Sequence, residues 1–146
     1  AIEETTDEPI THVIYSHSHA DHISAADMYP KNERPAVKAT DSLQRTILEM
    51  TSKCLGATAV IDENEKVLGI ITDGDLRRML ENVPDLQQLT AADLMSLQPK
   101  TIGKDALAVN ALDILRKHSI TQLIVVEDET YLGMIHLHNL VKEGLI

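Results

Sequence analysis

Apolar residues of this 146-residue chain are grouped into short runs that are separated by polar stretches. Residues 43–51 have the spacing of an amphipathic helix, with an apolar face made of Leu43, Ile47, Leu48 and Met50. Gly56 is expected to end that helix. Two compact apolar runs with the polar turn 62–66 between them are typical of paired buried strands. The expected order is helix 43–51, strand Ala57–Ile61, strand 67–71 and a helix from Asp73 to about Leu80.

The second half of the chain has the same order of elements. Asp105 is expected to cap a helix whose inward residues are Leu107, Ala111, Leu112 and Leu115. The expected elements are helix 106–117, strands 121–126 and 131–136, and helix 137–143. Short extended segments at 35–37 and 99–102 lead into the two halves, and a helical turn capped by Thr90 joins them.

The two halves are also related in sequence. Residues 69–76 read Gly-Ile-Ile-Thr-Asp-Gly-Asp-Leu, and residues 133–140 read Gly-Met-Ile-His-Leu-His-Asn-Leu. With two extra residues in the first copy, 25–28 (Ala-Ala-Asp-Met) falls opposite 91–94 (Ala-Ala-Asp-Leu). Such self-similarity indicates one supersecondary unit built twice. Two such units are expected to pack face to face, and the cleft between them is a candidate ligand site.

Composition and charge narrow the class of partner. The chain is 43% hydrophobic, has three Tyr and no Phe or Trp, and carries a net charge of −10. An acidic chain with few aromatic residues is not expected to bind nucleic acid or an anionic membrane. Cys54 is the single cysteine, so no internal disulfide can form. No apolar run has membrane-spanning length, and we expect a cytoplasmic protein.

The helix-strand-strand-helix order and the Gly-x-x-Thr-x-x-Asp string at 69–75 resemble a tandem cystathionine-β-synthase (CBS) domain, or Bateman module, from about residue 24 to 146. The resemblance implies an α/β (α+β) fold with two α-β-β-α repeats, 24–84 and 85–146, packed face to face with pseudo-two-fold symmetry. It also implies a homodimer formed by CBS modules. The helices after Asp73 and Leu137 offer apolar residues for it, namely Leu76, Met79, Leu80, Leu140 and Val141.

Three longer strings, 69–78, 89–95 and 137–144, resemble the C-terminal module of bacterial arabinose-5-phosphate isomerases of the 3-deoxy-manno-octulosonate (Kdo) pathway. In that family the module follows a sugar-isomerase (SIS) domain, which this chain lacks. The resemblance therefore implies a regulatory part of an isomerase with no catalytic residues of its own. It implies a nucleotide effector, either AMP or ATP or a CMP-sugar, and no required cofactor. A structural dimerisation module with an unused cleft is the alternative.

Four residues of the first repeat form the first candidate ligand site. Thr72 and Asp75 stand at a strand-to-helix junction, where a carboxylate suits ribose hydroxyls and a Thr hydroxyl suits phosphate. Arg77 and Arg78 can neutralise a phosphate. In CBS modules the Thr-x-x-Asp pair typically holds the ribose and phosphate of a nucleotide. The competing interpretation is that Asp73 and Asp75 only cap the helix and the arginines are solvated.

The second repeat carries a weaker version of this site. His136 and Asn139 replace Thr and Asp, so the carboxylate that suits ribose is lost. Thr101 and Thr121 lie where the family's lead-in and first strand line the cleft, and ordinary strand threonines are an equal alternative. His118 and His138 are expected to face solvent.

The first 23 residues look foreign to the repeats. Residues 11–16 read as a strand that runs into His17, His19, Asp21 and His22, the His-x-His-x-Asp-His pattern of metallo-β-lactamase-fold, alkylsulfatase-like hydrolases. That resemblance implies zinc ligands. A catalytic zinc needs further ligands, which that fold supplies from strands far downstream, and this sequence shows no matching context for them. We expect at most adventitious zinc on a natural, engineered or misassigned arm. A zinc-dependent hydrolase fragment is the runner-up function.

Overall fold

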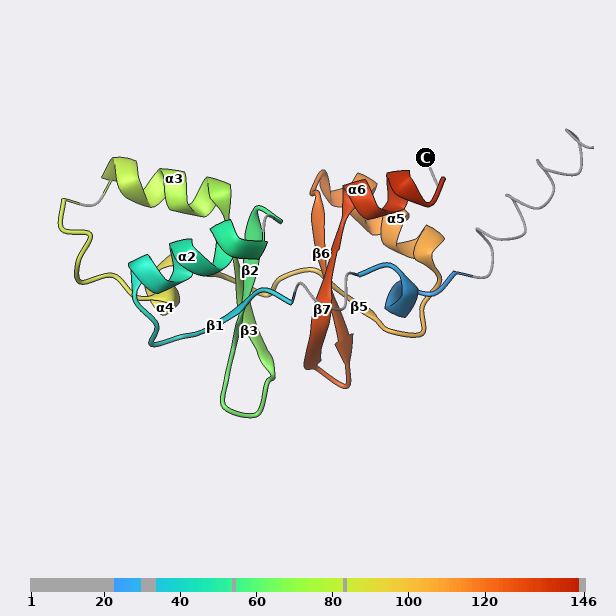
Figure 1. Cartoon of the computed structure of the whole chain (residues 1–146), viewed down its shortest axis with the longest axis horizontal. Coiled ribbons are helices and arrows are strands. Elements are labelled where there is room, and N and C mark those ends of the chain that lie inside the picture. The colour runs from blue at the N-terminus through green and yellow to red at the C-terminus, as the bar shows by residue number, and fades with distance from the viewer. Residues whose placement is uncertain (1–22, 30–33, 54, 83, 145–146) are drawn as a thin grey trace, which may run out of the picture.

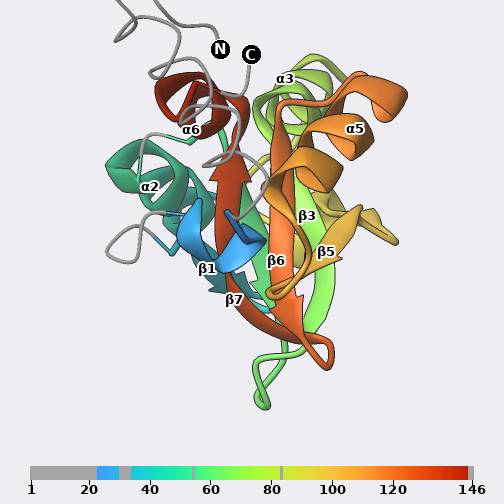
Figure 2. The same ribbon diagram turned by 90° about the vertical axis from the view of Figure 1, so that its right-hand side faces the viewer.

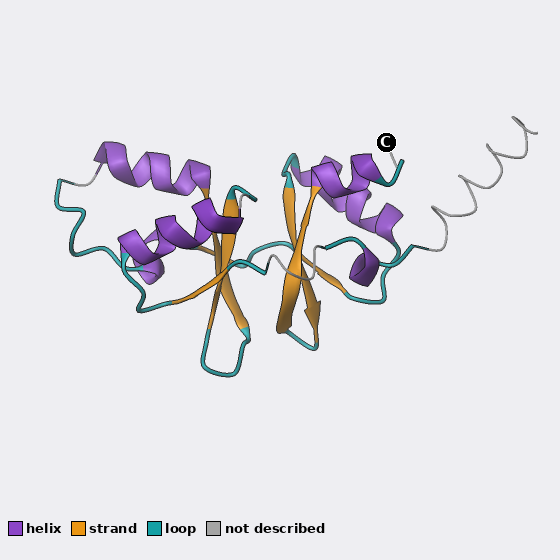
Figure 3. Ribbon diagram, viewed as in Figure 1, coloured by secondary structure: helices purple, strands orange, loops and turns teal. Residues whose placement is uncertain are grey.

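The computed structural model describes residues 23–29, 34–53, 55–82 and 84–144. These residues form two units, each with one β-sheet and its helices, and the two sheets face each other in the middle of the molecule (Figures 1 and 3). The first sheet has the strand order β1 (Ala36–Lys38), β2 (Ala57–Ile61), β3 (Val67–Thr72), β4 (Ser96–Leu97). The second has the order β5 (Thr101–Gly103), β6 (Gln122–Glu127), β7 (Thr130–His136). This arrangement confirms the α/β fold class that the sequence predicts.

The first sheet combines the helix-strand-strand-helix repeat with two short added strands. β1 is parallel to β2, and β3 is antiparallel to both β2 and β4. Gly56, at a φ of +71°, turns the chain between α2 and β2, as the sequence predicts. The elements of the first unit are β1 (Ala36–Lys38), α2 (Leu43–Lys53), β2 (Ala57–Ile61), β3 (Val67–Thr72), α3 (Asp73–Asn82), α4 (Ala91–Leu94) and β4 (Ser96–Leu97).

The second unit has the same strand topology as the first three strands of the first unit. β5 is parallel to β6, and β6 is antiparallel to β7, in the same registers as β1, β2 and β3. Ser119, at a φ of 54°, ends α5 in the left-handed conformation. Its elements are β5 (Thr101–Gly103), α5 (Ala108–His118), β6 (Gln122–Glu127), β7 (Thr130–His136) and α6 (Leu137–Lys142).

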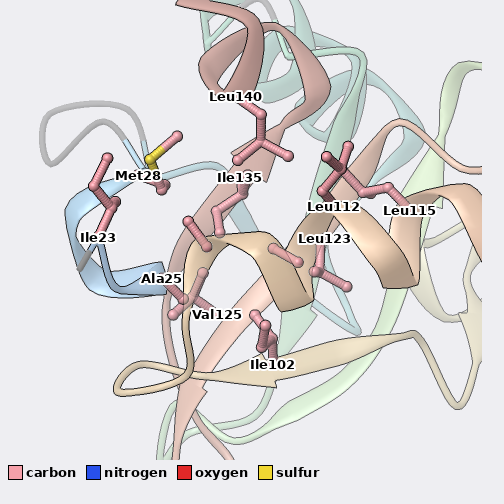
Figure 4. Packing of buried hydrophobic residues seen from close by; sticks show 12 residues of the cluster. Ile23, Ala25, Met28, Ile102, Leu112, Leu115, Leu123, Val125, Ile135 and Leu140 are labelled. Atoms are coloured by element: carbon pink, nitrogen blue, oxygen red, sulfur yellow. The ribbon is translucent and has the colours of Figure 1, made fainter. Parts of the chain in front are cut away.

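The short helices of the two repeats exchange places. The helical turn η1 (Ala25–Asp27), early in the chain, packs in the core of the second unit (Figure 4). Ala25 N donates to Ala106 O at 2.7 Å, and Ala108 N donates to Ile23 O at 2.8 Å. Conversely α4 (Ala91–Leu94), near the start of the second repeat, packs against the first unit. The packed units are therefore not the same as the sequence repeats, and each needs a segment from the other half (Figures 1 and 2).

The described residues form three hydrophobic cores. One lies between the second sheet and its helices, and another lies between the first sheet and its helices. The third lies between the two sheets, where Ala57, Ala59 and Ile61 of β2 contact residues of β6 and β7. The expected face-to-face packing of the two units is confirmed by this shared core.

Two predicted helix faces are wrong in part. On α2, Ile47 and Leu48 are 37% and 60% exposed, because the buried positions of this helix are Thr46 and Met50. On α5, the helix begins at Ala108 and Asp105 does not cap it. Leu107 is 41% exposed because its backbone is extended and forms an isolated bridge with Ser24 of the incoming N-terminal segment.

The residues proposed for a dimer contact divide into two groups. Leu140 is fully buried in the second unit's core, and Leu76 and Met79 pack against the first unit's core. Leu80 and Val141 remain 53% and 49% exposed. Among the described helices, none is both long and apolar enough to cross a membrane.

Gly69 in β3 and Gly133 in β7 allow a neighbouring segment of the chain to approach the strand closely. A Cβ on Gly133 would lie 2.2 Å from the Tyr29 ring, and one on Gly69 would lie 2.7 Å from Ser96 O and 2.9 Å from Met95 Sδ. Tyr29 and Met95 follow the exchanged helices η1 and α4, respectively. The repeated glycines are therefore explained by the packing of the exchanged segments.

We expect Gly133→Ala to lower the free energy of unfolding by about 1–3 kcal/mol, the usual effect of overpacking. Gly103→Ala is the matched control, because a Cβ there meets no atom within 4 Å. Urea unfolding at fixed protein concentration measures both. Equal stability of the two variants would show that Tyr29 does not occupy the space above Gly133.

Candidate functional site

Thr72 and Asp75 form a reciprocal capping box at the start of α3. Thr72 N and Thr72 Oγ1 donate to Asp75 Oδ2 at 2.8 and 3.0 Å, and Asp75 N donates to Thr72 Oγ1 at 3.4 Å. These bonds satisfy N–H groups that the first helical turn cannot pair internally. The side chain of Asp75 is 8% exposed. The two residues are thus brought together as the sequence predicts, and the capping interpretation describes their contacts in this structure.

The second carboxylate oxygen of Asp75 also has partners. Arg78 Nη2 donates to Asp75 Oδ1 in an ion pair, and Ser96 Oγ of β4 donates to the same oxygen at 3.3 Å. Arg77 and Arg78 are both exposed, as the competing interpretation has it, but Arg78 in addition pairs with Asp75. Sequence reasoning missed Ser96, since only the exchange of the connecting segment brings it to this place.

Within the part of the chain that the structure describes, the same capping arrangement occurs at three other helix starts. It is formed by Ser24 with Asp27, by Thr90 with Asp93, and by His136 with Asn139. Asp27 and Asp93 are exposed, whereas Asp75 is buried. The Thr-x-x-Asp pattern alone therefore does not identify a ligand site. What distinguishes Asp75 is a buried carboxylate with a nearby guanidinium.

Residues of both units meet beside the start of α3. Gln122 Nε2, at the start of β6, donates to Leu55 O at 2.9 Å, and Asp73 N donates to Gly56 O at 3.1 Å. A Cβ on Gly56 would lie 3.1 Å from Gln122 Nε2 and 3.2 Å from Asp73 Oδ2. The first candidate site therefore adjoins the boundary between the units. The sequence does not indicate Gln122, because the family pattern points to its neighbour Thr121.

Two hollows lie along α2. The smaller, of about 280 Å³, adjoins the α3 start and is lined by Ile47, Met50, Thr51, Gly56, Asp73 and Leu76. The larger, of about 460 Å³, is mainly apolar and is lined by Ser42, Leu43, Gln44, Ile47, Leu48, Leu86 and Gln87. Only the smaller hollow borders the first candidate site, so it is the more relevant of the two to a ligand held by Thr72.

The second candidate site is centred on His136, which ends β7 and caps α6. His136 Nδ1 accepts from His138 N at 3.0 Å, and His136 N donates to Asn139 Oδ1 at 2.7 Å. Burial, and then the neighbouring imidazole of His138, lowers the pKa of His136 below its usual 6.5. Its role as an acceptor requires the neutral ring, with the proton on Nε2.

The two threonines assigned to the second site are placed differently. Thr121 is exposed just before β6, and its carbonyl accepts from Leu137 N at 2.8 Å, so it lies beside the α6 start. Thr101 is exposed at the start of β5 and pairs with Ile124, on the side of β6 away from β7. The structure therefore brings Thr121 to His136 and leaves Thr101 one strand further away.

The proposed metal ligands His17, His19, Asp21 and His22 lie outside the described residues. Among the described residues, no group of three or more His, Cys, Asp or Glu side chains is placed to hold a metal ion.

A protein-family model described as CBS domain matches residues 25–82 and 91–145. The chain is 39% identical over 119 residues to the arabinose 5-phosphate isomerase KdsD of Escherichia coli (strain K12). It is 43% identical over 112 residues to KdsD of Francisella tularensis subsp. tularensis. These alignments cover 82% and 76% of this chain but 36% and 34% of those proteins, so the chain spans about a third of their length.

Solved structures share the fold at low sequence identity. A CBS domain from Sphaerobacter thermophilus gives a TM-score of 0.76 at 21% identity, covering 94% of this chain and 97% of that one. CBSX2 in complex with AMP gives 0.71 at 22%, covering 84% and 96%. The CBS domain of a bacterial CNNM/CorC family Mg²⁺ transporter in complex with ATP gives 0.74 at 18%, covering 94% and 97%. These comparisons do not support the resemblance of residues 11–22 to metallo-hydrolases.

The lowered pKa of His136 makes a pH-dependent contribution to stability. The unfolded histidine takes up a proton first as the pH falls, so this contribution is complete above about pH 6.5 and declines below it. His136→Asn keeps a capping side chain but does not titrate. We therefore expect this variant to lose less unfolding free energy than the wild type between pH 7.5 and 5.5.

His118→Asn is the control, because it removes an exposed histidine from α5 and leaves the α6 cap in place. Parallel pH profiles of the wild type and His136→Asn would contradict the assignment. Urea unfolding at each pH is the measurement.

Proposed function

Because the chain belongs to the CBS domain family, we propose that it is a regulatory module that binds a nucleotide at the boundary between its two units. The observation that carries this proposal is the buried carboxylate of Asp75 at a strand-to-helix junction beside residues of the other unit. Two proteins of the same fold have been solved with AMP and with ATP, which supports a nucleotide as the ligand.

The proposed roles follow from the chemistry of each group. Asp75 accepts hydrogen bonds from the ribose hydroxyls, and the positive end of α3, where Thr72 is part of the capping box, faces phosphate. Arg77 and Arg78 supply positive charge for the phosphate. A weaker second site is proposed at Thr121, His136 and Asn139, with Thr101 at its edge. The missing carboxylate makes this second site less suited to ribose.

The similarity to arabinose 5-phosphate isomerases supports a role in controlling such an enzyme. In this proposal the module is linked to a SIS catalytic domain of the Kdo pathway and performs no catalysis itself. A nucleotide can regulate the enzyme only if it binds two arrangements of the modules with different affinity. A CMP-sugar is a candidate effector alongside AMP and ATP, because that pathway ends in a cytidylyl sugar.

The assignment of Asp75 predicts that Asp75→Asn weakens nucleotide binding at least tenfold. The carboxylate's charge-assisted hydrogen bonds are lost, and each is worth about 1.5–3 kcal/mol. Asp93→Asn is the matched control, since Asp93 forms the same capping box on α4 but is exposed. Calorimetric titration with AMP, ATP, CMP and a CMP-sugar measures the affinities.

Equal binding by the wild type and Asp75→Asn would refute the site. Failure of every nucleotide to bind the wild type would favour the alternative, a structural dimerisation module.

We also propose that the module forms a homodimer through the exposed apolar residues of α3 and α6. We expect the double variant Leu80→Asp/Val141→Asp to be monomeric at about 50 µM, where the wild type is dimeric, because charges in an apolar contact are costly. Leu97→Asp, at a 69% exposed position on β4, is the control and should stay dimeric. Light scattering decides, and a monomeric wild type would contradict the proposal.

A further inference from the structure

The carboxylate of Asp75 is fully engaged inside the protein. An ionised carboxylate has about four acceptor positions. Thr72 N and Thr72 Oγ1 occupy Oδ2, and Arg78 and Ser96 occupy Oδ1. With 8% of its side chain exposed, Asp75 has little room for a further donor. A ribose can therefore bind this group only by replacing partners that it already has.

The two oxygens differ in how readily they give up their partners. At Oδ2, loss of the bond from Thr72 N would leave a part-buried backbone donor unpaired, which is costly. At Oδ1, the bond from Ser96 is long at 3.3 Å, and the Arg78 side chain is 68% exposed. A guanidinium that is largely in water can leave at low cost. A diol is therefore expected to replace Arg78 at Oδ1 and to leave the capping box intact.

We propose that Arg78 is a positioning residue that makes this site select a phosphorylated ribose over a nucleoside without phosphate. This inference rests on the nucleotide site proposed above. A nucleoside that takes Oδ1 breaks the Asp75–Arg78 ion pair and offers the guanidinium nothing in return. A nucleotide brings its own anion, and a guanidinium can donate two parallel hydrogen bonds to a phosphate. The loss of one ion pair is then offset by the gain of another.

Arg77 provides the contrast within the same helix turn. It carries the same charge and is exposed, but Arg78 is the arginine that pairs with Asp75. Removal of Arg77 should weaken phosphate attraction through its charge alone. Removal of Arg78 should change the binding of a neutral nucleoside as well, and in the opposite direction.

The test compares wild type, Arg78→Gln, Arg78→Lys and Arg77→Gln in titrations with adenosine, AMP, cytidine and CMP, followed by amide chemical shifts. For Arg78→Gln we expect nucleoside affinity to rise about two- to fivefold, the range that a partly exposed ion pair can contribute. Its nucleotide affinity should fall by a similar factor. Arg78→Lys keeps the cation but loses the two parallel hydrogen bonds, so its nucleotide affinity should lie between those of the wild type and Arg78→Gln. Arg77→Gln should lower nucleotide affinity without raising nucleoside affinity.

Unchanged or weaker nucleoside binding by Arg78→Gln would overturn this inference, and so would no measurable nucleoside binding by that variant up to the solubility limit. If the wild type binds nucleotides in that case, the nucleotide site stands and only the role of Arg78 fails. If the wild type binds none of the four compounds, the proposed function fails with it. Melting temperatures establish that each variant is folded before its titration is interpreted.

Discussion

Strand β2 is buried at all five of its positions, and this double-sided burial determines how the whole molecule is built. Side chains alternate between the faces of a strand, so one face of β2 packs on its own helices and the other needs a second cover. The partner sheet supplies that cover. Ala57 and Ala59 are small, which admits the large side chains of Tyr131 and Met134 from β7. Neither unit can bury its sheet alone, and the boundary between them is fixed by this packing.

Polar contacts around the shared core and beside the start of α3 complete the boundary. The hydroxyl of Tyr131 donates to Pro35 O at 2.7 Å, and Arg34 donates to Tyr131 O at 2.8 Å while its guanidinium lies over the Tyr131 ring. Near the start of α3, Gln122 crosses from the second unit to Leu55. The first candidate site therefore adjoins a direct contact between the units. A ligand that disturbs this contact has a short physical route to the relative position of the two units.

The sequence predicted what depends on local pattern and missed what depends on exchange between the halves. Strand Ala57–Ile61 has the predicted bounds, because a short apolar run bounded by glycine and a polar turn has few alternatives. Leu107 was predicted to lie inward on a helix, but pairing with the N-terminal segment keeps it extended. At the site, the motif located Asp75. Its partner Ser96 could not be found, since 21 residues and an exchanged helix separate the two.

We propose that a nucleotide binds beside Asp75 at the boundary between the two units. Amide chemical-shift mapping of the labelled protein during titration with AMP, ATP, CMP and a CMP-sugar tests it most directly. We expect the amides of Thr72, Asp75 and Gln122 to show saturable shifts with at least one of these compounds. The proposed site is contradicted if none of these compounds shifts these amides at millimolar concentration, or if the only shifts occur along the larger hollow on α2.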